Sequence, residues 1–148
     1  PPLGCAPRAV SALAHAFSRA ALDVPGLSEA RARQLREAGA LREPADAFRW
    51  MTDGGALPNA TGIDGNGTAV HAATIADLPG WGEKSLANVV AALRRTAEDG
   101  VPLHRFVYSL GIRHVGAHTS RILAAEFGSA TAFLAAGRQR FAELAEEG

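Results

Sequence analysis

The stretch Leu78-Pro79-Gly80-Trp81-Gly82-Glu83 decides the fold, because it recurs along the chain. Val24-Pro25-Gly26-Leu27-Ser28-Glu29 matches it without a gap at an offset of 54 residues, and Ile112-Arg113-His114-Val115-Gly116 is a looser third copy. In each copy an apolar residue precedes a tight turn, a second apolar residue lies in mid-turn, and a helical pattern follows at once. The repetition predicts a protein built from units in which a tight turn leads into a helix.

Each of these turns has the chemistry of an anion site. Glycine in a tight turn permits positive φ and lets the backbone approach a ligand without a Cβ atom in the way. The unpaired N–H groups of the turn and of the first helical turn, together with the helix dipole, favour a phosphate oxygen. Contacts of this kind do not read the bases of a nucleic acid.

The three copies are not equivalent. Ser28 replaces the second glycine in the first copy, and His114 replaces the first glycine in the third copy. The middle copy keeps both glycines and is therefore expected to bind phosphate best. The mid-turn apolar residues are expected to fix the turns to the core; they are Leu27, Trp81 and Val115.

The chain is neutral overall but basic in one segment. Its 148 residues include 15 basic and 15 acidic side chains. Residues 83–121 hold six Lys and Arg side chains against three acidic ones. A polyanion is attracted by the local charge of a surface, so a neutral protein can bind it through a basic segment. Two alternatives stay open at this stage: the basic segment is only a solvated helix face, and the turns are only corners between helices.

Composition places the chain among ordinary globular domains. Hydrophobic residues are 47% and charged residues 20%, and a chain of this length buries roughly 70% of its unfolded surface.

A single cysteine, Cys5, excludes an intramolecular disulfide framework and predicts a reducing intracellular compartment, either cytoplasm and nucleoid or a eukaryotic organelle or nucleus. No apolar run approaches the ~18–20 residues of a membrane span, so no membrane partner is expected. Because the chain opens with Pro1-Pro2, we expect a piece of a longer protein.

Apolar residues recur at helical spacing through most of the chain, which predicts an all-α fold. Ser28 is a candidate N-cap, and Gly39 and Gly128 fall where helices should end. The expected helices lie near 7–20, 28–38, 45–51, 83–98, 102–110, 117–127, 129–136 and 138–147. Residues 52–70 are rich in glycine and poor in apolar residues, which predicts a flexible loop or insertion.

These motifs resemble the helix-hairpin-helix region of the bacterial-type NAD-dependent DNA ligases. The resemblance covers nearly the whole chain except the 52–70 loop. It implies an all-α, tandem helix-hairpin-helix domain with a long Gly-rich loop insertion. The stretches that carry it are Ser18-Arg19, Leu22-Asp23-Val24, Gly26-Leu27, Ala45-Asp46, 78–90, Leu110–Gly116 and Phe127-Gly128-Ser129, of which Leu110–Gly116 is the most distinctive.

The resemblance also implies a domain organisation. Residues 1–20 would be the end of a zinc module with a linker helix, and residues 21–51 the first helix-hairpin-helix unit. A flexible insertion would follow at 52–72. Residues 73–148 would hold the second and third units, with the chain ending before a fourth.

The position of Cys5 matches one edge of that family's zinc module. In the family, the last of four zinc-binding cysteines precedes a Ser-Arg pair by thirteen residues, which is the separation of Cys5 and Ser18. The resemblance therefore implies that Cys5 is the fourth metal ligand, with zinc bound only if three cysteines lie upstream of Pro1. One thiolate cannot hold a structural zinc, so in this chain alone Cys5 is expected to behave as a small apolar residue.

The family's chemistry points to sites outside this chain. The resemblance implies an enzyme, a ligase that transfers AMP from NAD to a lysine in a Lys-x-Asp-Gly setting and then to a 5′-phosphate. Lys84 is the only lysine here, and Ser85-Leu86-Ala87 follows it. NAD and a divalent metal are therefore expected to bind the parent enzyme elsewhere. The fragment lacks the adenylation domain and is expected to be inactive alone.

The implied role of this segment is to bind the backbone of duplex DNA, without sequence preference, in a ligase that seals nicks during replication and repair. N–H groups at Gly82 and Gly116, backed by basic side chains, would hold phosphates on both sides of a minor groove, and Thr119 and Ser120 would add hydroxyl donors. The expected partner is nicked double-stranded DNA, and the chain is expected to be a monomer. The candidate DNA-binding residues are Gly26, Ser28, Gly80, Gly82, Lys84, Arg113, His114, Gly116, His118 and Thr119.

Two other functions compete with the ligase fragment. One is a stand-alone helix-hairpin-helix module of another repair or recombination protein. The other is a helical protein–protein scaffold in which the hairpins only turn corners. The Gly111–Gly116 stretch and the Cys5 spacing favour the ligase over the module, and the basic bias of residues 83–121 disfavours the scaffold.

Overall fold

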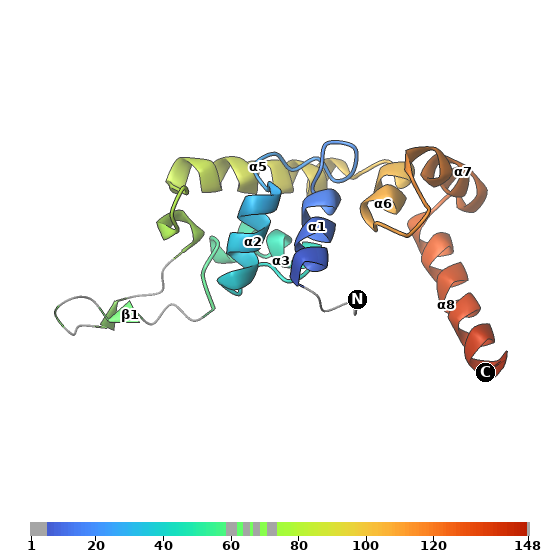
Figure 1. Cartoon of the computed structure of the whole chain (residues 1–148). Helices are drawn as coiled ribbons and strands as arrows, with labels where there is room; N and C mark the ends of the chain where they lie inside the picture. The colour runs from blue at the N-terminus through green and yellow to red at the C-terminus, as the bar shows by residue number, and fades with distance from the viewer. Residues whose placement is uncertain (1–5, 59–61, 64–65, 67–68, 71–73, 148) are drawn as a thin grey trace.

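A computed structural model describes residues 6–58, 62–63, 66, 69–70 and 74–147 (Figure 1). It confirms the predicted all-α class, with one short β-hairpin inside the Gly-rich segment. Strands β1 (Gly62–Ile63) and β2 (Ala69–Val70) pair antiparallel there. The helices are α1 (Ala6–Ala16), α2 (Glu29–Glu37), α3 (Pro44–Phe48), α4 (Trp50–Asp53), the 3-10 turn η1 (Ile75–Asp77), α5 (Glu83–Asp99), α6 (Leu103–Ser109), α7 (Ala117–Phe127) and α8 (Ala130–Glu147).

The core lies where α1, α2, α3 and α5 meet. Their apolar residues recur at the helical period, so each helix presents one apolar face to the others. Leu35, Ile75 and Leu93 are fully buried, and Trp50 is buried with them. The first two hairpins are supported by this core, because residues of both turns pack against it.

The helix between residues 7 and 20 is shorter than predicted. It ends at Ala16, because Ser18 Oγ donates to the carbonyl of His15 at 2.6 Å and the Leu22 N–H donates to the carbonyl of Ala16 at 3.0 Å. These bonds satisfy carbonyls that a longer helix would have used. Asp23 then takes φ +55°, which turns the chain into the first hairpin.

Two further helix boundaries were predicted wrongly. The helix expected at 45–51 is broken at Arg49 into α3 and α4. The two helices expected at 129–136 and 138–147 are one helix, α8, which runs through Gly137. A single glycine costs a helix only ~1 kcal/mol relative to alanine, so it does not force a break.

The Gly-rich insertion is closed at its base. Its predicted start at residue 52 is wrong by two residues, because Thr52 and Asp53 belong to α4. The Ile75 N–H donates to the carbonyl of Gly55 at 2.9 Å, and Ala56 pairs with Thr74 in an antiparallel bridge. The chain therefore leaves the folded body and returns to it at adjacent points.

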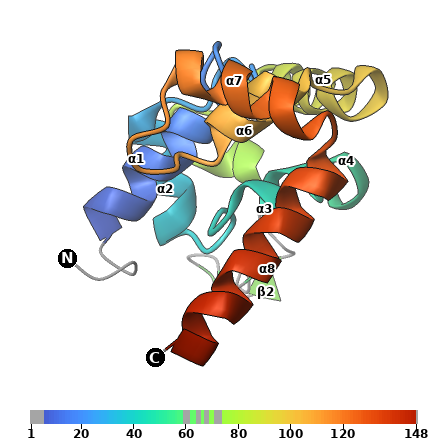
Figure 2. The same cartoon turned by 90° about the vertical axis from the view of Figure 1, so that its right-hand side faces the viewer.

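The third unit, formed by α6, α7 and α8, is attached through side chain–backbone bonds to α1 and the segment that follows it. His15 Nε2 lies 2.7 Å from the carbonyl oxygen of Tyr108, and Arg105 Nη2 donates to the carbonyl of Arg19 at 2.6 Å. Arg105 also lies 3.9 Å from a carboxylate oxygen of Asp23. Both views place α5 and α7 along one edge of the molecule, while α8 leads away from it (Figures 1 and 2).

Candidate nucleic-acid interface

The three predicted turns share a positive φ at one equivalent position. The equivalent positions Gly26, Gly80 and His114 have φ of +99°, +79° and +67°. Because non-glycine residues rarely adopt this region, a histidine in it marks the third turn as a variant of the same hairpin. The repeat inferred from the sequence is therefore present in the backbone.

The mid-turn apolar residues fix the hairpins as predicted in the first two copies. Leu27 is 4% exposed, and Trp81 is partly buried against the core. Val115 is partly buried in the third hairpin. Ile112, which corresponds to the buried Val24 of the first copy, is 40% exposed. The third hairpin therefore lies further from the core than the other two.

The second hairpin, residues 78–82, is open at its tip. A Cβ atom placed on Gly80 or on Gly82 would meet no atom within 4 Å. The N–H groups of Glu83 and Lys84, in the first turn of α5, have no hydrogen-bond partner among the described residues. These donors and the positive end of the α5 dipole can together receive a phosphate oxygen.

The predicted donor at this hairpin needs a correction. The Gly82 N–H donates to Ser85 Oγ at 2.9 Å and is therefore occupied. The serine caps the helix from within, as the third residue of a capping box does. Gly82 leaves the way open for a phosphate to approach the hairpin. The free donors are the N–H groups of Glu83 and Lys84.

The third hairpin, residues 112–116, is open in the same way. A Cβ atom on Gly116 would meet nothing within 4 Å. In the described part of the chain, the Gly116 N–H has no partner. Arg113, His114 and His118 are exposed beside it, and Thr119 is partly exposed. This places five of the candidate residues around one open corner.

Ser120 was predicted to add a hydroxyl donor to this corner, and that prediction is wrong. Its side chain is fully buried in α7, and its Oγ has no partner among the residues that the structure describes. A buried hydroxyl without a partner costs roughly 1–3 kcal/mol. Ser120 therefore belongs to the interior of the third unit.

That interior position yields a stability prediction. Ser120→Ala is expected to raise the free energy of unfolding by about 0.5–1 kcal/mol, because it removes an unpaired polar atom and improves helix propensity. Chemical denaturation followed by circular dichroism measures the change. A loss of stability would mean that the hydroxyl has a partner, such as a backbone carbonyl or a water molecule.

The first hairpin, residues 24–28, is packed rather than open. A Cβ atom on Gly26 would lie 2.9 Å from Val89 Cγ2 of α5. Ser28 is the N-cap of α2, as predicted, and its Oγ accepts the Arg31 N–H at 3.4 Å. Gly26 and Ser28 thus have structural roles in packing and capping, and a DNA contact at either stays a prediction.

Two side chains that sequence reasoning did not select, Arg31 and Gln34, act with Trp81 to join the first two hairpins. Arg31 donates from Nη1 to the carbonyl of Gly26 and from Nη2 to the carbonyl of Gly80, both at 3.1 Å. Its guanidinium lies 4.1 Å from the centre of the Trp81 ring. Gln34 donates to the carbonyl of Pro79 at 2.8 Å and accepts from Trp81 Nε1 at 2.9 Å. Arg31, Gln34 and Trp81 are called the hairpin latch below.

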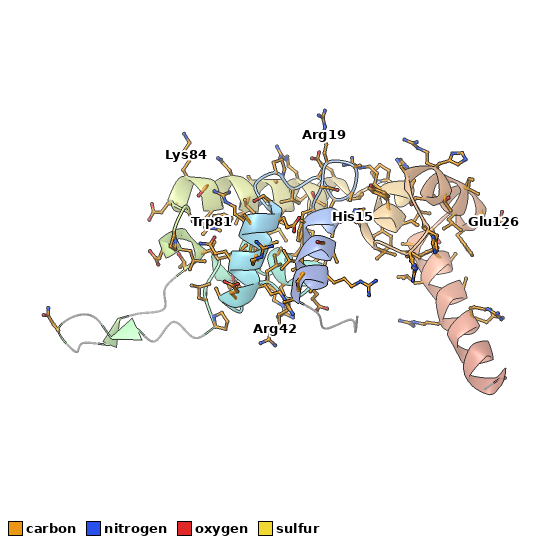
Figure 3. All side chains as sticks on the ribbon, viewed as in Figure 1. His15, Arg19, Arg42, Trp81, Lys84 and Glu126 are labelled. Carbon is orange, nitrogen blue, oxygen red and sulfur yellow. The ribbon has the colours of Figure 1, made fainter. Side chains whose placement is uncertain are left out.

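Basic side chains project from the edge that carries the hairpins. In Figure 3, Lys84 of α5 and Arg19 of the segment between α1 and α2 point away from the same edge. Both are exposed. Arg19 was not among the predicted contact residues, although it lies in the Ser18-Arg19 pair that the family resemblance uses.

The predicted zinc ligand, Cys5, lies outside the described residues. Within the described ranges, no three His, Cys, Asp or Glu side chains come together as possible metal ligands. The described part of the chain therefore offers no ligand set into which a metal would fit. Its helices also include none long and apolar enough to cross a membrane.

Three turns with positive φ at the equivalent position, each followed directly by a helix, are typical of a helix-hairpin-helix protein. The sequence model of the helix-hairpin-helix motif matches residues 105–148, which include the third hairpin and α8. Over most of its length the chain is similar to proteins named DNA ligase, which assigns it to a segment of that kind of protein.

The relatives that carry this assignment are similar along most of the chain. The DNA ligase of Rhodopseudomonas palustris (strain HaA2) is 38% identical over 146 residues, which is 97% of this chain. The DNA ligase of Alkalilimnicola ehrlichii is 38% identical over 99% of the chain, and that of Gluconacetobacter diazotrophicus is 38% identical over 87%. The chain spans only 18%, 18% and 16% of these relatives, respectively.

Proposed function

We propose that this chain binds the sugar-phosphate backbone of duplex DNA, without sequence preference, as part of an NAD-dependent DNA ligase that seals nicks in replication and repair. The observation that carries the proposal is the pair of open hairpins at the starts of α5 and α7. Among the residues that the structure describes, no other atom obstructs either corner, and each corner presents N–H groups without a partner. Each has a basic side chain beside it, Lys84 at one and Arg113 at the other.

The contacts in this proposal are made to phosphates. N–H groups and helix dipoles at the two corners recognise a negative oxygen and carry no information about the base. The two helices lie along one edge of the molecule (Figures 1 and 2), and the proposed ligand is a duplex bound against that edge. Binding of this kind weakens as salt rises, with a slope of about −0.9 in log affinity for each phosphate neutralised.

The catalytic part of the proposed ligase lies outside this chain. NAD and a divalent metal would bind the parent enzyme elsewhere, and zinc would require cysteines upstream of Cys5. NAD supplies the AMP group that activates the 5′-phosphate, while the residues described here only hold the DNA. In this proposal the fragment is inactive alone, a monomer, and located in a reducing intracellular compartment.

The similarity to ligases along most of the chain supports this reading over a stand-alone repair module. The scaffold alternative is tested by titrating the 148-residue chain into a fluorescent duplex with a single nick, and following anisotropy at several salt concentrations. The proposal expects saturable binding that several unrelated sequences share and that salt weakens. A chain that is folded by circular dichroism but leaves anisotropy unchanged at low salt would support the scaffold.

A charge pair on one helical turn gives a matched test of the second hairpin. Glu83 and Lys84 are adjacent and exposed at the start of α5. Lys84→Gln is expected to weaken DNA binding about 3–10-fold at low salt and to reduce the salt slope by about 0.9. Glu83→Gln is expected to strengthen binding about 2–5-fold, because it removes a negative charge beside the proposed phosphate site. Equal effects of the two changes would place the DNA elsewhere.

A further inference from the structure

The hairpin latch ties the second hairpin to the first across the Gly-rich insertion. Three hydrogen bonds join α2 to the second hairpin, two donated by Arg31 and Gln34 and one donated by Trp81, between residues 45 to 49 positions apart in the sequence. The insertion lies between the two ends. The tip of the second hairpin is therefore positioned by α2 as well as by η1, where the Ile75 carbonyl accepts the Leu78 N–H at 3.1 Å.

Arg31 is the centre of this arrangement. Its two terminal nitrogens each donate to the carbonyl of a positive-φ glycine, Gly26 in one hairpin and Gly80 in the other. Its flat face covers Trp81 at 4.1 Å. A guanidinium can do this because it is planar, forked and able to stack on an aromatic ring, whereas the lysine ammonium is a point charge with neither property.

We propose that Arg31, supported by Gln34 and Trp81, is a positioning residue that sets the orientation of the second hairpin's phosphate donors. The inference rests on the proposed DNA-binding function. With its backbone carbonyls held, the tip of the hairpin presents the N–H groups of α5 in a single geometry, so that less conformational freedom is lost on binding. Arg31 acts through the hairpin and not as a phosphate ligand.

The test separates the shape of the Arg31 side chain from its charge. Arg31→Lys keeps the positive charge, but a lysine cannot bond both carbonyls and also stack on the Trp81 ring. Arg31→Gln loses the positive charge as well as these contacts. We expect each variant of the full 148-residue chain to bind a nicked duplex about 5–10-fold more weakly. The salt slope of Arg31→Lys should equal that of the wild type, because no phosphate contact has been removed.

Arg33 provides a control on the same helix. Its side chain is 55% exposed and pairs at 3.8 Å with Glu29 one turn earlier. Arg33→Lys and Arg33→Gln are expected to change affinity less than 2-fold. Gln34→Leu removes two latch bonds without changing charge, and it should weaken binding in the same direction as the Arg31 variants.

Tryptophan fluorescence reports the latch independently of DNA. Trp50 is buried in the core, whereas Trp81 is partly exposed beneath the Arg31 guanidinium. Acrylamide should therefore quench the Arg31 variants more strongly than the wild type, and the Arg33 variants no more strongly. Melting curves establish that every variant is folded at the temperature of the titrations.

Each outcome has a distinct meaning. If Arg31→Lys binds like the wild type while Arg31→Gln is weak, charge alone is required and the latch proposal is wrong. Wild-type affinity in both Arg31 variants would also overturn it. If the wild-type chain itself does not bind the nicked duplex, the proposed function fails and the quenching result stands only as a statement about structure.

Discussion

Valine at both Gly82 and Gly116 is expected to weaken binding to a nicked duplex about 100-fold. The loss of a hydrogen bond to a charged group costs roughly 1.5–3 kcal/mol, and every 1.4 kcal/mol is tenfold in affinity. Each valine would place its side chain in front of one open corner, where no atom now lies within 4 Å of the added Cβ. Each single variant should therefore bind the nicked duplex about 10-fold more weakly. Anisotropy titration at fixed salt measures the affinity of the two single variants and of the double variant.

The two glycines suit this experiment because neither is needed for its backbone conformation. Gly82 and Gly116 have φ of −157° and −87° with extended ψ, a region that valine occupies readily. Gly137→Ala, on the helix that leads away from the binding edge, is the control and should bind like the wild type. Full affinity in the double variant would show that the corners do not contact DNA.

Gly26→Ala is expected to lower the free energy of unfolding by about 2–4 kcal/mol. The new methyl group would lie 2.9 Å from Val89 Cγ2, and Val89 is buried in the core. Overpacking of a core costs about 1–3 kcal/mol, and a non-glycine residue at positive φ adds roughly 1–2 kcal/mol. Thermal or urea unfolding followed by circular dichroism gives the value.

Alanine at Gly82 is the matched comparison, since that position is open and has an extended backbone. It is expected to change the free energy of unfolding by less than about 0.5 kcal/mol, as surface substitutions usually do. If Gly26→Ala were as stable as Gly82→Ala, the first hairpin would not be seated on α5.

The starts of the hairpin helices could be predicted because their signals are local. The helices expected to start at residues 28, 83 and 117 begin at Glu29, Glu83 and Ala117. At each of these points a turn residue is followed directly by a helical pattern of apolar residues. Helix ends were less predictable. α1 stops at Ala16 through bonds from Ser18 and Leu22, which depend on the path of the chain after the helix.

The candidate site was predicted only in part. The open corners at Gly80, Gly82 and Gly116 follow from glycine in a repeated turn, but the sequence does not reveal which N–H groups are already occupied. The Ser85 hydroxyl takes the Gly82 donor, and Val89 covers Gly26. Val89 reaches Gly26 through the packing of α5 against the first hairpin, which no local pattern shows, whereas Ser85 lies only three residues after Gly82 and bonds it locally.

The hairpin latch was beyond sequence reasoning for a similar reason. Arg31 and Gln34 fall on a short, strongly charged helix and look like ordinary surface residues. Their partners are main-chain carbonyls at Pro79 and Gly80, which carry no residue-type signal. Bonds between a side chain and a distant backbone leave no pattern in a single sequence.

The closed base of the insertion makes it a practical site for protein engineering. Ala56 and Thr74 are paired, so any peptide spliced between them starts and finishes at points that are already joined. Doubling the length of such a loop adds only about 0.6 kcal/mol of closure entropy. A fluorescent reporter or an affinity tag grafted there should leave the rest of the molecule intact, and would allow the chain to be followed without touching either terminus.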